Sequence, residues 1–103
     1  MAEVDALMGA LERRADALKT LGYTVRFDLT DGGGSIFVDA TGGKAAVSSG
    51  GGEADTVLKL KSDNLMKLIE GRLSPMIAFS TGRLRVQGSQ GVALKLASLL
   101  EGD

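Results

Sequence analysis

The first twenty residues place apolar side chains at helical spacing. Residues three and four apart share one face of an α-helix, and the apolar set here forms such a stripe, opposite Glu12, Arg13 and Lys19. The members of the stripe are Val4, Leu7, Met8, Leu11, Ala15, Leu18 and Leu21. Gly22 follows, where a helix commonly ends. The pattern predicts one amphipathic helix over residues 2–21.

Beyond Gly22 the apolar residues alternate with polar ones, which is the period of a strand with one buried face. The alternation predicts strands at 25–30, 36–41, around 45–47, 55–61 and 83–87. If Gly32-Gly33 form a two-residue turn, Arg26 lies opposite Asp39 on the polar face, and a Gly42-Gly43 turn sets the next pairing. The apolar pairs expected from these turns are Val25–Ala40, Phe27–Val38, Leu29–Ile36, Ala40–Ala45 and Val38–Val47.

Three apolar helical segments accompany the last two strands. Ser62 or Asp63 is expected to cap a helix that ends at Gly71, and Ser74-Pro75 to begin a short helix that Gly82 stops. Ser89 is expected to cap the last helix, Gln90–Leu100. Five strands with one apolar face and four helical segments predict an α+β fold, in which helices cover one face of a single, mainly antiparallel sheet.

Length and charge narrow the class of protein. A chain of 103 residues has room for one core, so a single domain over residues 1–103 is expected. Twelve basic and thirteen acidic residues with only four aromatic ones do not favour nucleic acid as a partner. No cysteine, no signal peptide, no long apolar run and no terminal S-K-L-type address together predict a cytoplasmic location.

Candidate chemistry is sparse. Gly43-Lys44 lacks the rest of a phosphate-binding loop, and Gly32 and Gly34 lack dinucleotide spacing, so hairpin turns explain the glycines. Without histidine or cysteine, no nucleophile has a base partner, and the carboxylates fit solvated or salt-bridged positions better than a metal site. We therefore expect no enzyme activity, no metal and no cofactor.

The polar face of the predicted sheet is basic. Its cations either meet anionic headgroups or the phosphates of an acyl-coenzyme A, or they only keep the face hydrated and discourage edge pairing. They are Arg26, Lys59, Lys61, Arg83 and Arg85. Phe37 shares this face and is either covered by a neighbouring segment or part of a contact.

Residues 65–100 crowd apolar side chains into the predicted helices, and the last helix is apolar nearly all round. A plain core explains such crowding, and so does a cavity, in which Met66 and Met76 would add pliable thioethers. Periodicity alone leaves both interpretations open.

The same region resembles the sterol carrier protein type 2 family. Its motifs are Gly71-Arg72-Leu73-Ser74-Pro75, Ala78-Phe79-Ser80-Thr81-Gly82-Arg83-Leu84, and Gly88 through Leu96. Upstream, Val25–Leu29 before a glycine-rich turn and A-D-T-V-L-K-L before S-D-N-L-M-K-L-I also fit, so the resemblance covers about residues 4–100.

The resemblance implies an apolar tunnel between sheet and helices that holds a fatty acyl, acyl-coenzyme A, isoprenoid or sterol-like lipid without catalysis. The expected lining residues are Phe27, Leu29, Leu65, Ile69, Leu73, Met76, Ile77, Phe79, Leu84, Leu94 and Leu96, with Gly71–Pro75 as a gate. The expected partners are an apolar lipid, at most transiently a membrane surface, and possibly a lipid-handling enzyme. The alternative is a protein-interaction or accessory module of a lipid-modifying or biosynthetic complex.

Overall fold

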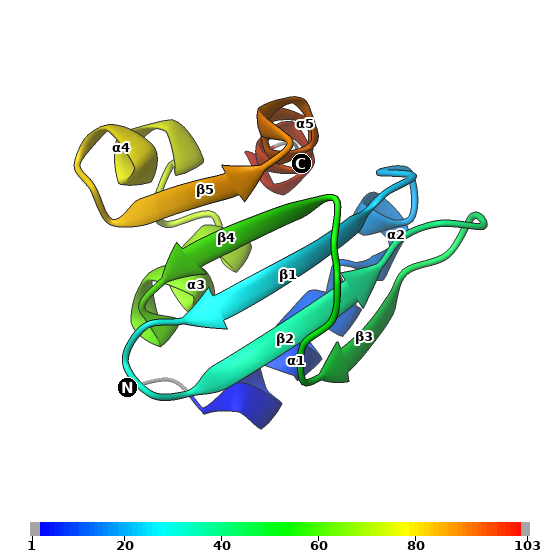
Figure 1. Ribbon diagram of the computed structural model, residues 1–103, viewed down its shortest axis with the longest axis horizontal. Helices are drawn as coiled ribbons and strands as arrows, with labels where there is room; N and C mark the ends of the chain where they lie inside the picture. The colour runs from blue at the N-terminus through cyan, green and yellow to red at the C-terminus, as the bar shows by residue number, and fades with distance from the viewer. Residues whose placement is uncertain (1–2, 102–103) are drawn as a thin grey trace.

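The computed structural model describes residues 3–101 and shows one five-stranded sheet backed by helices (Figure 1). Residues 1–2 and 102–103 of the predicted domain, and with them the start of the predicted first helix, lie outside the described range. The strands are β1 (Thr24–Leu29), β2 (Gly34–Asp39), β3 (Ala46–Ser49), β4 (Thr56–Leu60) and β5 (Leu84–Gly88). Their order is β3-β2-β1-β4-β5, with β1 and β4 parallel and the other neighbours antiparallel. The predicted α+β class with a mainly antiparallel sheet is confirmed.

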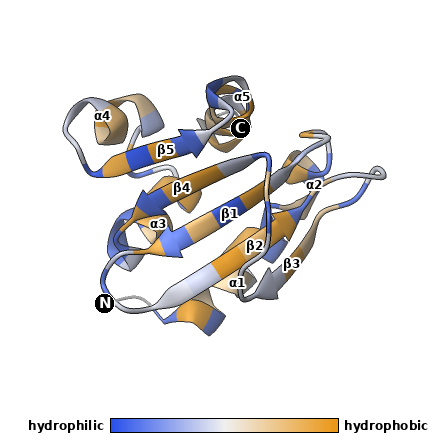
Figure 2. Cartoon of the chain, viewed as in Figure 1, coloured by the Kyte–Doolittle hydropathy of each residue, from blue (hydrophilic) through white to orange (hydrophobic). Residues whose placement is uncertain are grey.

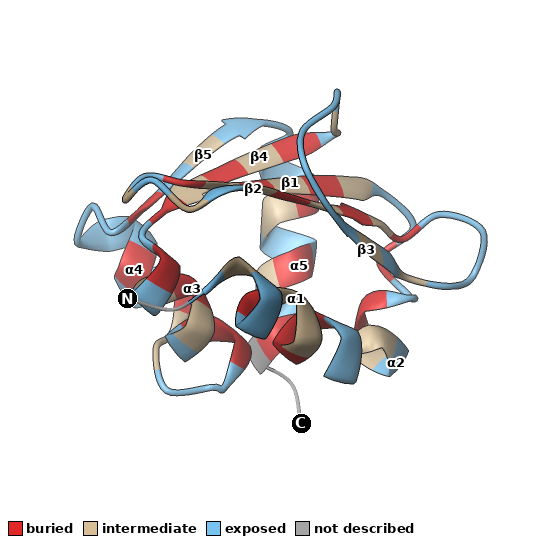
Figure 3. Cartoon of the chain, turned by 90° about the horizontal axis from the view of Figure 1, so that it is seen from below, coloured by how far each residue is buried: buried red, intermediate tan, exposed pale blue. Residues whose placement is uncertain are grey.

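The helices all lie on one side of the sheet (Figure 3). They are α1 (Val4–Arg13), α2 (Ala15–Leu18), α3 (Ser62–Ile69), α4 (Pro75–Ser80) and α5 (Gln90–Glu101). The prediction of one continuous helix to residue 21 is wrong, because the backbone leaves helical geometry at Arg14, with φ −99° and ψ 13°. At this break the Arg14 guanidinium donates hydrogen bonds to carbonyl oxygens of Ile69 and Leu100, at 3.2 and 3.0 Å.

The register of the first hairpin differs from the prediction by two residues. Val25 pairs with Val38 and Phe27 with Ile36, so four residues, 30–33, connect the strands instead of two. The longer connection follows from β1 continuing its bonding toward β4, since the Thr30 N–H donates to the Leu60 carbonyl at 2.9 Å. A shift of two residues keeps the same side chains on the buried face, because the period of a strand is two.

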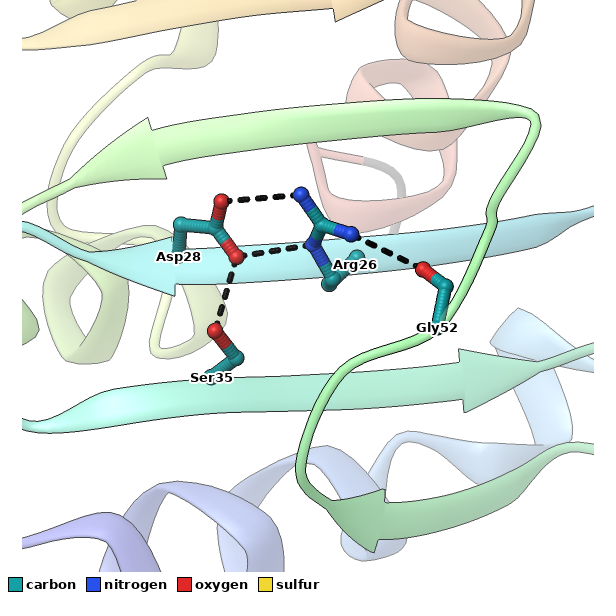
Figure 4. Close-up of polar contacts among 4 residues, drawn as sticks. All are labelled: Arg26, Asp28, Ser35 and Gly52. Carbon is teal, nitrogen blue, oxygen red and sulfur yellow. Dashed lines mark hydrogen bonds and ion pairs between the residues drawn. The ribbon is translucent and has the colours of Figure 1, made fainter.

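Arg26 therefore lies opposite Phe37, and the predicted Arg26–Asp39 pair is wrong. The guanidinium of Arg26 instead donates to both carboxylate oxygens of Asp28 on its own strand, at 2.9 and 3.1 Å (Figure 4). Asp39 accepts hydrogen bonds from Thr41. The predicted Val38–Val47 pair of the second hairpin is confirmed, whereas Ala40 and Ala45 lie just beyond the ends of β2 and β3.

The segment between β3 and β4 crosses the outer face of the sheet (Figures 1 and 3). Arg26 holds this segment by donating to the Gly52 carbonyl at 2.9 Å (Figure 4). A side-chain carbon at Gly52 would stand 3.7 Å from the Phe37 ring, so the crossing chain packs on that ring. Phe37 is consequently half-buried and is not a free apolar contact on this face.

The core fills the space between the sheet and the helices. Inward-facing strand residues such as Phe27, Ile36 and Leu60 belong to one hydrophobic cluster with Leu7 and Leu11 of α1, and all five are almost completely buried. Hydrophobic and polar residues alternate along the central strands (Figure 2), as expected for a sheet covered on one side. At the far end of β5, Gly88 has φ +85°, and a side chain there would meet the Asp55 carbonyl at 2.8 Å, so glycine is required.

Candidate functional site

An apolar pocket of about 110 Å³ lies between the β5 edge of the sheet and the helices α4 and α5. Gln90 is the one polar side chain among its described lining residues. The pocket is lined by Phe27, Leu58, Leu68, Pro75, Met76, Phe79, Leu84, Val86, Gln90, Ala93, Leu94, Leu96, Ala97 and Leu100. Such a lining suits an apolar ligand.

Strand alternation and helical spacing create the pocket. Leu84 and Val86 point inward from β5, because the intervening Arg85 points to the outer face. On α5, Ala93 and Ala97 lie four residues apart on one helix face, and their small side chains leave the space open. Pro75 begins α4 at the first helical position, as predicted, and the Arg83 N–H closes the helix on the Ala78 carbonyl at 2.9 Å.

Three large apolar side chains at the mouth of the pocket are unusually exposed. Met76 is 59% exposed, Phe79 52% and Leu94 60%. All three line the pocket and also reach solvent. The site is therefore open at one end instead of sealed in the core.

The structure brings six of the eleven predicted lining residues together in this pocket. These six are Phe27, Met76, Phe79, Leu84, Leu94 and Leu96. Leu29, Leu65 and Ile69 are buried in the core and do not line it, and Ile77 points to solvent with 55% of its surface exposed. Leu73 lines a second hollow, of about 250 Å³.

The second hollow contains the joint that the family resemblance marked as a gate. It is formed by residues 71–75 with Leu68 and Leu100, and it shares Leu68, Pro75 and Leu100 with the main pocket. Since the two hollows have common walls, a movement of the joint would change the shape of both.

The expected set of lining residues omitted several that the structure places in the pocket. Leu58 and Val86 were outside that set, although alternation places them on the sheet face against which the lipid was expected to lie. The α5 members Gln90, Ala93 and Ala97 were missed because small and polar residues do not register as apolar crowding. Their spacing of three and four residues, in line with Leu94, was the available signal.

The carboxylates with shifted pKa values lie outside the pocket. Burial raises the pKa of Asp28, but hydrogen bonds from Arg26 and Ser35 outweigh it and hold this pKa below its usual value. The Ser62 hydroxyl lowers the pKa of Asp31, and Thr41 lowers that of Asp39. The pocket lining offers no acid–base pair, and residues 3–101 contain no cluster of three metal-ligating His, Cys, Asp or Glu side chains.

Side chains cap the N-terminal ends of helices α3 and α5. Asp31 accepts from the Ser62 N–H at 3.3 Å and from its hydroxyl at 2.6 Å, so the start of α3 is capped from the β1–β2 connection. The expectation that Ser62 or Asp63 caps α3 is wrong, because the N-cap position is Lys61 and both residues lie inside the first turn of the helix. The Ser89 hydroxyl does accept from the Val92 N–H at 3.2 Å, so the predicted cap of α5 is confirmed.

Within the described residues, no helix is long and apolar enough to cross a bilayer.

Comparison with known proteins identifies relatives of the whole fold. Residues 5–101 match the model of the SCP-2 sterol transfer family. Hydroxysteroid dehydrogenase-like protein 2 of Xenopus tropicalis is 35% identical over 88 residues, which are 82% of this chain and 21% of that protein. The chain thus spans about a fifth of the length of the first curated relatives it matches.

Two solved structures share the fold. The sterol carrier protein domain 2 of Helicoverpa armigera is 27% identical with a TM-score of 0.71, covering 93% of this chain and 80% of that one. The apo form of sterol carrier protein 2 from Yarrowia lipolytica is 23% identical with a TM-score of 0.72, covering 93% and 88%. They confirm the fold that the resemblance implied. The family match confirms the resemblance itself and supports lipid binding or transfer in general. This chain belongs to the SCP-2 sterol transfer family.

Proposed function

We propose that this protein is a non-catalytic lipid carrier that holds the apolar part of a fatty acid, acyl-coenzyme A, isoprenoid or sterol-like molecule in the pocket beside α4 and α5. The observation that carries the proposal is the pocket lining, which is apolar except for Gln90 and opens to solvent between Met76, Phe79 and Leu94. We place the protein in the cytoplasm, since a sequence without cysteine is compatible with a reducing compartment.

Burial of the lipid supplies the affinity. Each methylene transferred from water into the pocket contributes about 0.8 kcal/mol, before the entropy of ordering the chain is subtracted. Part of the predicted lining set, including Leu65 and Ile69, lies in the core next to the pocket, and we propose that these residues are reached only when the pocket enlarges.

Enlargement is needed because the present pocket is small. Its volume of about 110 Å³ is below the roughly 150 Å³ of an apolar cavity that holds one benzene molecule. A long acyl chain therefore requires α4 or α5 to move outward. Glycines in the left-handed conformation flank α4, Gly71 at φ +77° and Gly82 at φ +78°. We propose that the turns at these two glycines act as the hinges of the movement.

Filling the pocket from α5 tests the proposal. Ala97→Phe puts a ring into the lining, and Ser98→Phe puts the same ring on the exposed side of the same helix as a control. We expect Ala97→Phe to weaken binding of a fluorescent fatty acid at least tenfold and Ser98→Phe to leave it near wild type. Native mass spectrometry of the freshly purified wild type should show a retained lipid mass. Equal binding by both variants, or no binding by a folded wild type, would contradict the proposal.

A second candidate is an accessory module that presents a lipid to an enzyme of a lipid-modifying or biosynthetic complex. It is favoured by one observation, that relatives named hydroxysteroid dehydrogenase-like protein 2 are about five times the length of the matched region. In that case a lipid-handling enzyme should co-purify with the chain, and Ala97→Phe should abolish lipid retention while the enzyme still co-purifies. Free carriage predicts lipid retention with no such enzyme.

A further inference from the structure

The outer face of the sheet carries a basic corner that lipid binding in the pocket does not use. The end of β4 lies beside the start of β5 there (Figure 1), and both strands carry hydrophilic bands (Figure 2). We call its four residues the cation ladder: Lys59, Lys61, Arg83 and Arg85. They alternate with the buried residues Leu58, Leu60 and Leu84, so the ladder lies on the side of the sheet opposite the pocket.

The ladder consists of two like-charge pairs across neighbouring strands. Lys59 lies directly opposite Arg85, and the same register continued by one residue sets Lys61 opposite Arg83. The two residues of a pair are about 5 Å apart at their Cα atoms, and the two pairs are about 7 Å apart along the strands. Like charges directly opposite each other destabilise a sheet. A bound anion would relieve the repulsion within each pair.

The acidic side chains next to the ladder are engaged by other residues. Asp28 lies beside Lys59 in the register of β1 and β4, but both of its carboxylate oxygens accept from the Arg26 guanidinium (Figure 4). Asp31 accepts from the backbone N–H and the hydroxyl of Ser62. None of the four ladder side chains forms an ion pair within residues 3–101. Their charge is therefore not neutralised by the described part of the chain.

The ladder is also open to solutes. The segment that crosses the outer face enters β4 at its first residue, Thr56, whereas the ladder lies at the other end of that strand (Figure 1). Lys61, Arg83 and Arg85 are exposed, and Lys59 is half-buried. Protection of a sheet edge explains basic residues on β5, which is an edge strand. It does not explain Lys59, because β4 has a neighbouring strand on each side.

We propose that the cation ladder is a second binding site, for a small anion with two linked phosphate groups. One phosphate group lies between Lys59 and Arg85, and the other between Lys61 and Arg83. Each arginine donates paired hydrogen bonds to phosphate oxygens, and each lysine adds a point charge. The shared chemistry is a diphosphate, which either a free nucleotide or the headgroup of a lipid would supply. The site goes beyond the carrier function, since it lies on the other side of the sheet.

Isothermal titration at constant ionic strength tests the site, with inorganic diphosphate, inorganic phosphate and citrate as probes. Lys59→Gln with Arg85→Gln removes one pair, and Lys61→Gln with Arg83→Gln removes the other. The matched control is Arg13→Gln with Lys44→Gln, which removes one exposed arginine and one exposed lysine outside the ladder. None of these residues lines the pocket, so palmitate binding is measured alongside as an independent readout. Circular dichroism establishes that each variant is folded.

We expect diphosphate to bind the wild type about tenfold more tightly than phosphate, and each ladder variant to lose about tenfold in affinity for it. The control should change by less than about twofold, and palmitate binding should be the same in all. Three results would overturn the site: diphosphate bound no more tightly than phosphate, citrate bound as tightly as diphosphate, or a loss in the control equal to that in the ladder variants.

Geranyl diphosphate distinguishes the two sources of the diphosphate. If the ligand is a lipid, geranyl diphosphate binds more tightly than diphosphate, and Ala97→Phe in the pocket removes the gain. If the ligand is free, the two bind alike, with or without Ala97→Phe. Either result supports the site, provided that the ladder variants weaken both. A folded wild type that binds palmitate but not diphosphate overturns the ladder alone. Diphosphate binding without palmitate binding leaves the ladder standing, and the carrier function fails.

Discussion

Single polar side chains join segments that are far apart in this chain. Asp31 reaches the start of α3 at Ser62, and Arg14 reaches the ends of α3 and α5 at Ile69 and Leu100. Both side chains satisfy backbone groups that a helix leaves unpaired at its ends. The packing of the helices on the sheet thus depends on contacts that no local sequence pattern contains.

The bond between Asp31 and Ser62 predicts a pH-dependent stability. The Ser62 hydroxyl lowers the pKa of Asp31 below its ordinary value of 3.8, so the ionised carboxylate stabilises the folded state. This contribution is complete above about pH 3.8 and is lost as the pH falls further, through the pKa of the folded protein. We expect Asp31→Asn to lower the free energy of unfolding at neutral pH, with a difference from wild type that shrinks in acid. Urea unfolding across this pH range measures it.

A double-variant cycle provides the control for this prediction. Ser62→Ala removes the same hydrogen bond from the other side, so the two substitutions together should cost less than the sum of each alone. Additive effects at neutral pH, or a difference between wild type and Asp31→Asn that does not change with pH, would show that the two side chains do not act as a pair.

The sequence pattern predicted which side chains are buried far better than it predicted the hydrogen-bond partners of the polar side chains. Alternation placed Phe27, Ile36 and Leu58 on the inner face, because the two-residue period of a strand is visible in any short stretch. The partners of Asp31 and Arg14 were not visible, since they lie 31 and more than 50 residues away and depend on the finished fold. The same limit explains why Arg26 was assigned to Asp39 instead of to Asp28.

At the scale of elements, type was predictable and length was not. The register of the first hairpin differs from the predicted one by two residues. The hydrogen bond from Thr30 to β4 lengthens the connection, and β4 is distant in the sequence. The first helix divides at Arg14 because a tertiary contact competes with local helical preference there. The pairing of β2 with β3 keeps the register that a turn at Gly42-Gly43 predicts, although residues 40–45 lie outside both strands.

The Arg14 contacts make a prediction about how the helices are held together. Replacing Arg14 with methionine keeps much of the side-chain volume and removes hydrogen bonds to the carbonyl ends of α3 and α5. We expect the free energy of unfolding to fall by about 1–2 kcal/mol, the usual scale for hydrogen bonds from a charged donor. Urea unfolding followed by circular dichroism measures the change.

The neighbouring arginine is the matched control for this variant. Arg13 is exposed at the end of α1, so Arg13→Met should change the free energy of unfolding by less than about 0.5 kcal/mol. If Arg13→Met and Arg14→Met cost the same, the contacts of Arg14 with α3 and α5 contribute nothing measurable, and the helix break has another cause.

At the scale of the whole molecule, the filled core and the pocket lie side by side in one layer and share buried residues such as Phe27, Leu68 and Leu96. The central strands and α1 form a filled interior, whereas the pocket lies under the β5 edge, where α4 and α5 leave apolar side chains exposed. The sequence left two interpretations of the apolar residues in 65–100, a plain core and a cavity, and each of them holds for a part of this segment. Leu65 and Ile69 belong to the core, and Met76, Phe79 and Leu94 belong to the pocket, a division set by where α4 packs and not by hydrophobicity.

This division predicts that the pocket half opens while the core half stays closed. Helix α4 has six residues, three of its large apolar side chains are exposed, and the pocket it covers is too small for a long chain, so its amides should exchange hydrogen faster than those of β1. Adding palmitate should slow exchange in α4 and α5 by about tenfold or more and leave β1 unchanged, because ligand occupancy stabilises the ordered state. Hydrogen–deuterium exchange with mass spectrometry measures this, with Ala97→Phe as a variant that should show no protection. Slow exchange of α4 without ligand, together with no change on adding palmitate to a wild type that binds it, would mean that the lipid enters without any movement of α4.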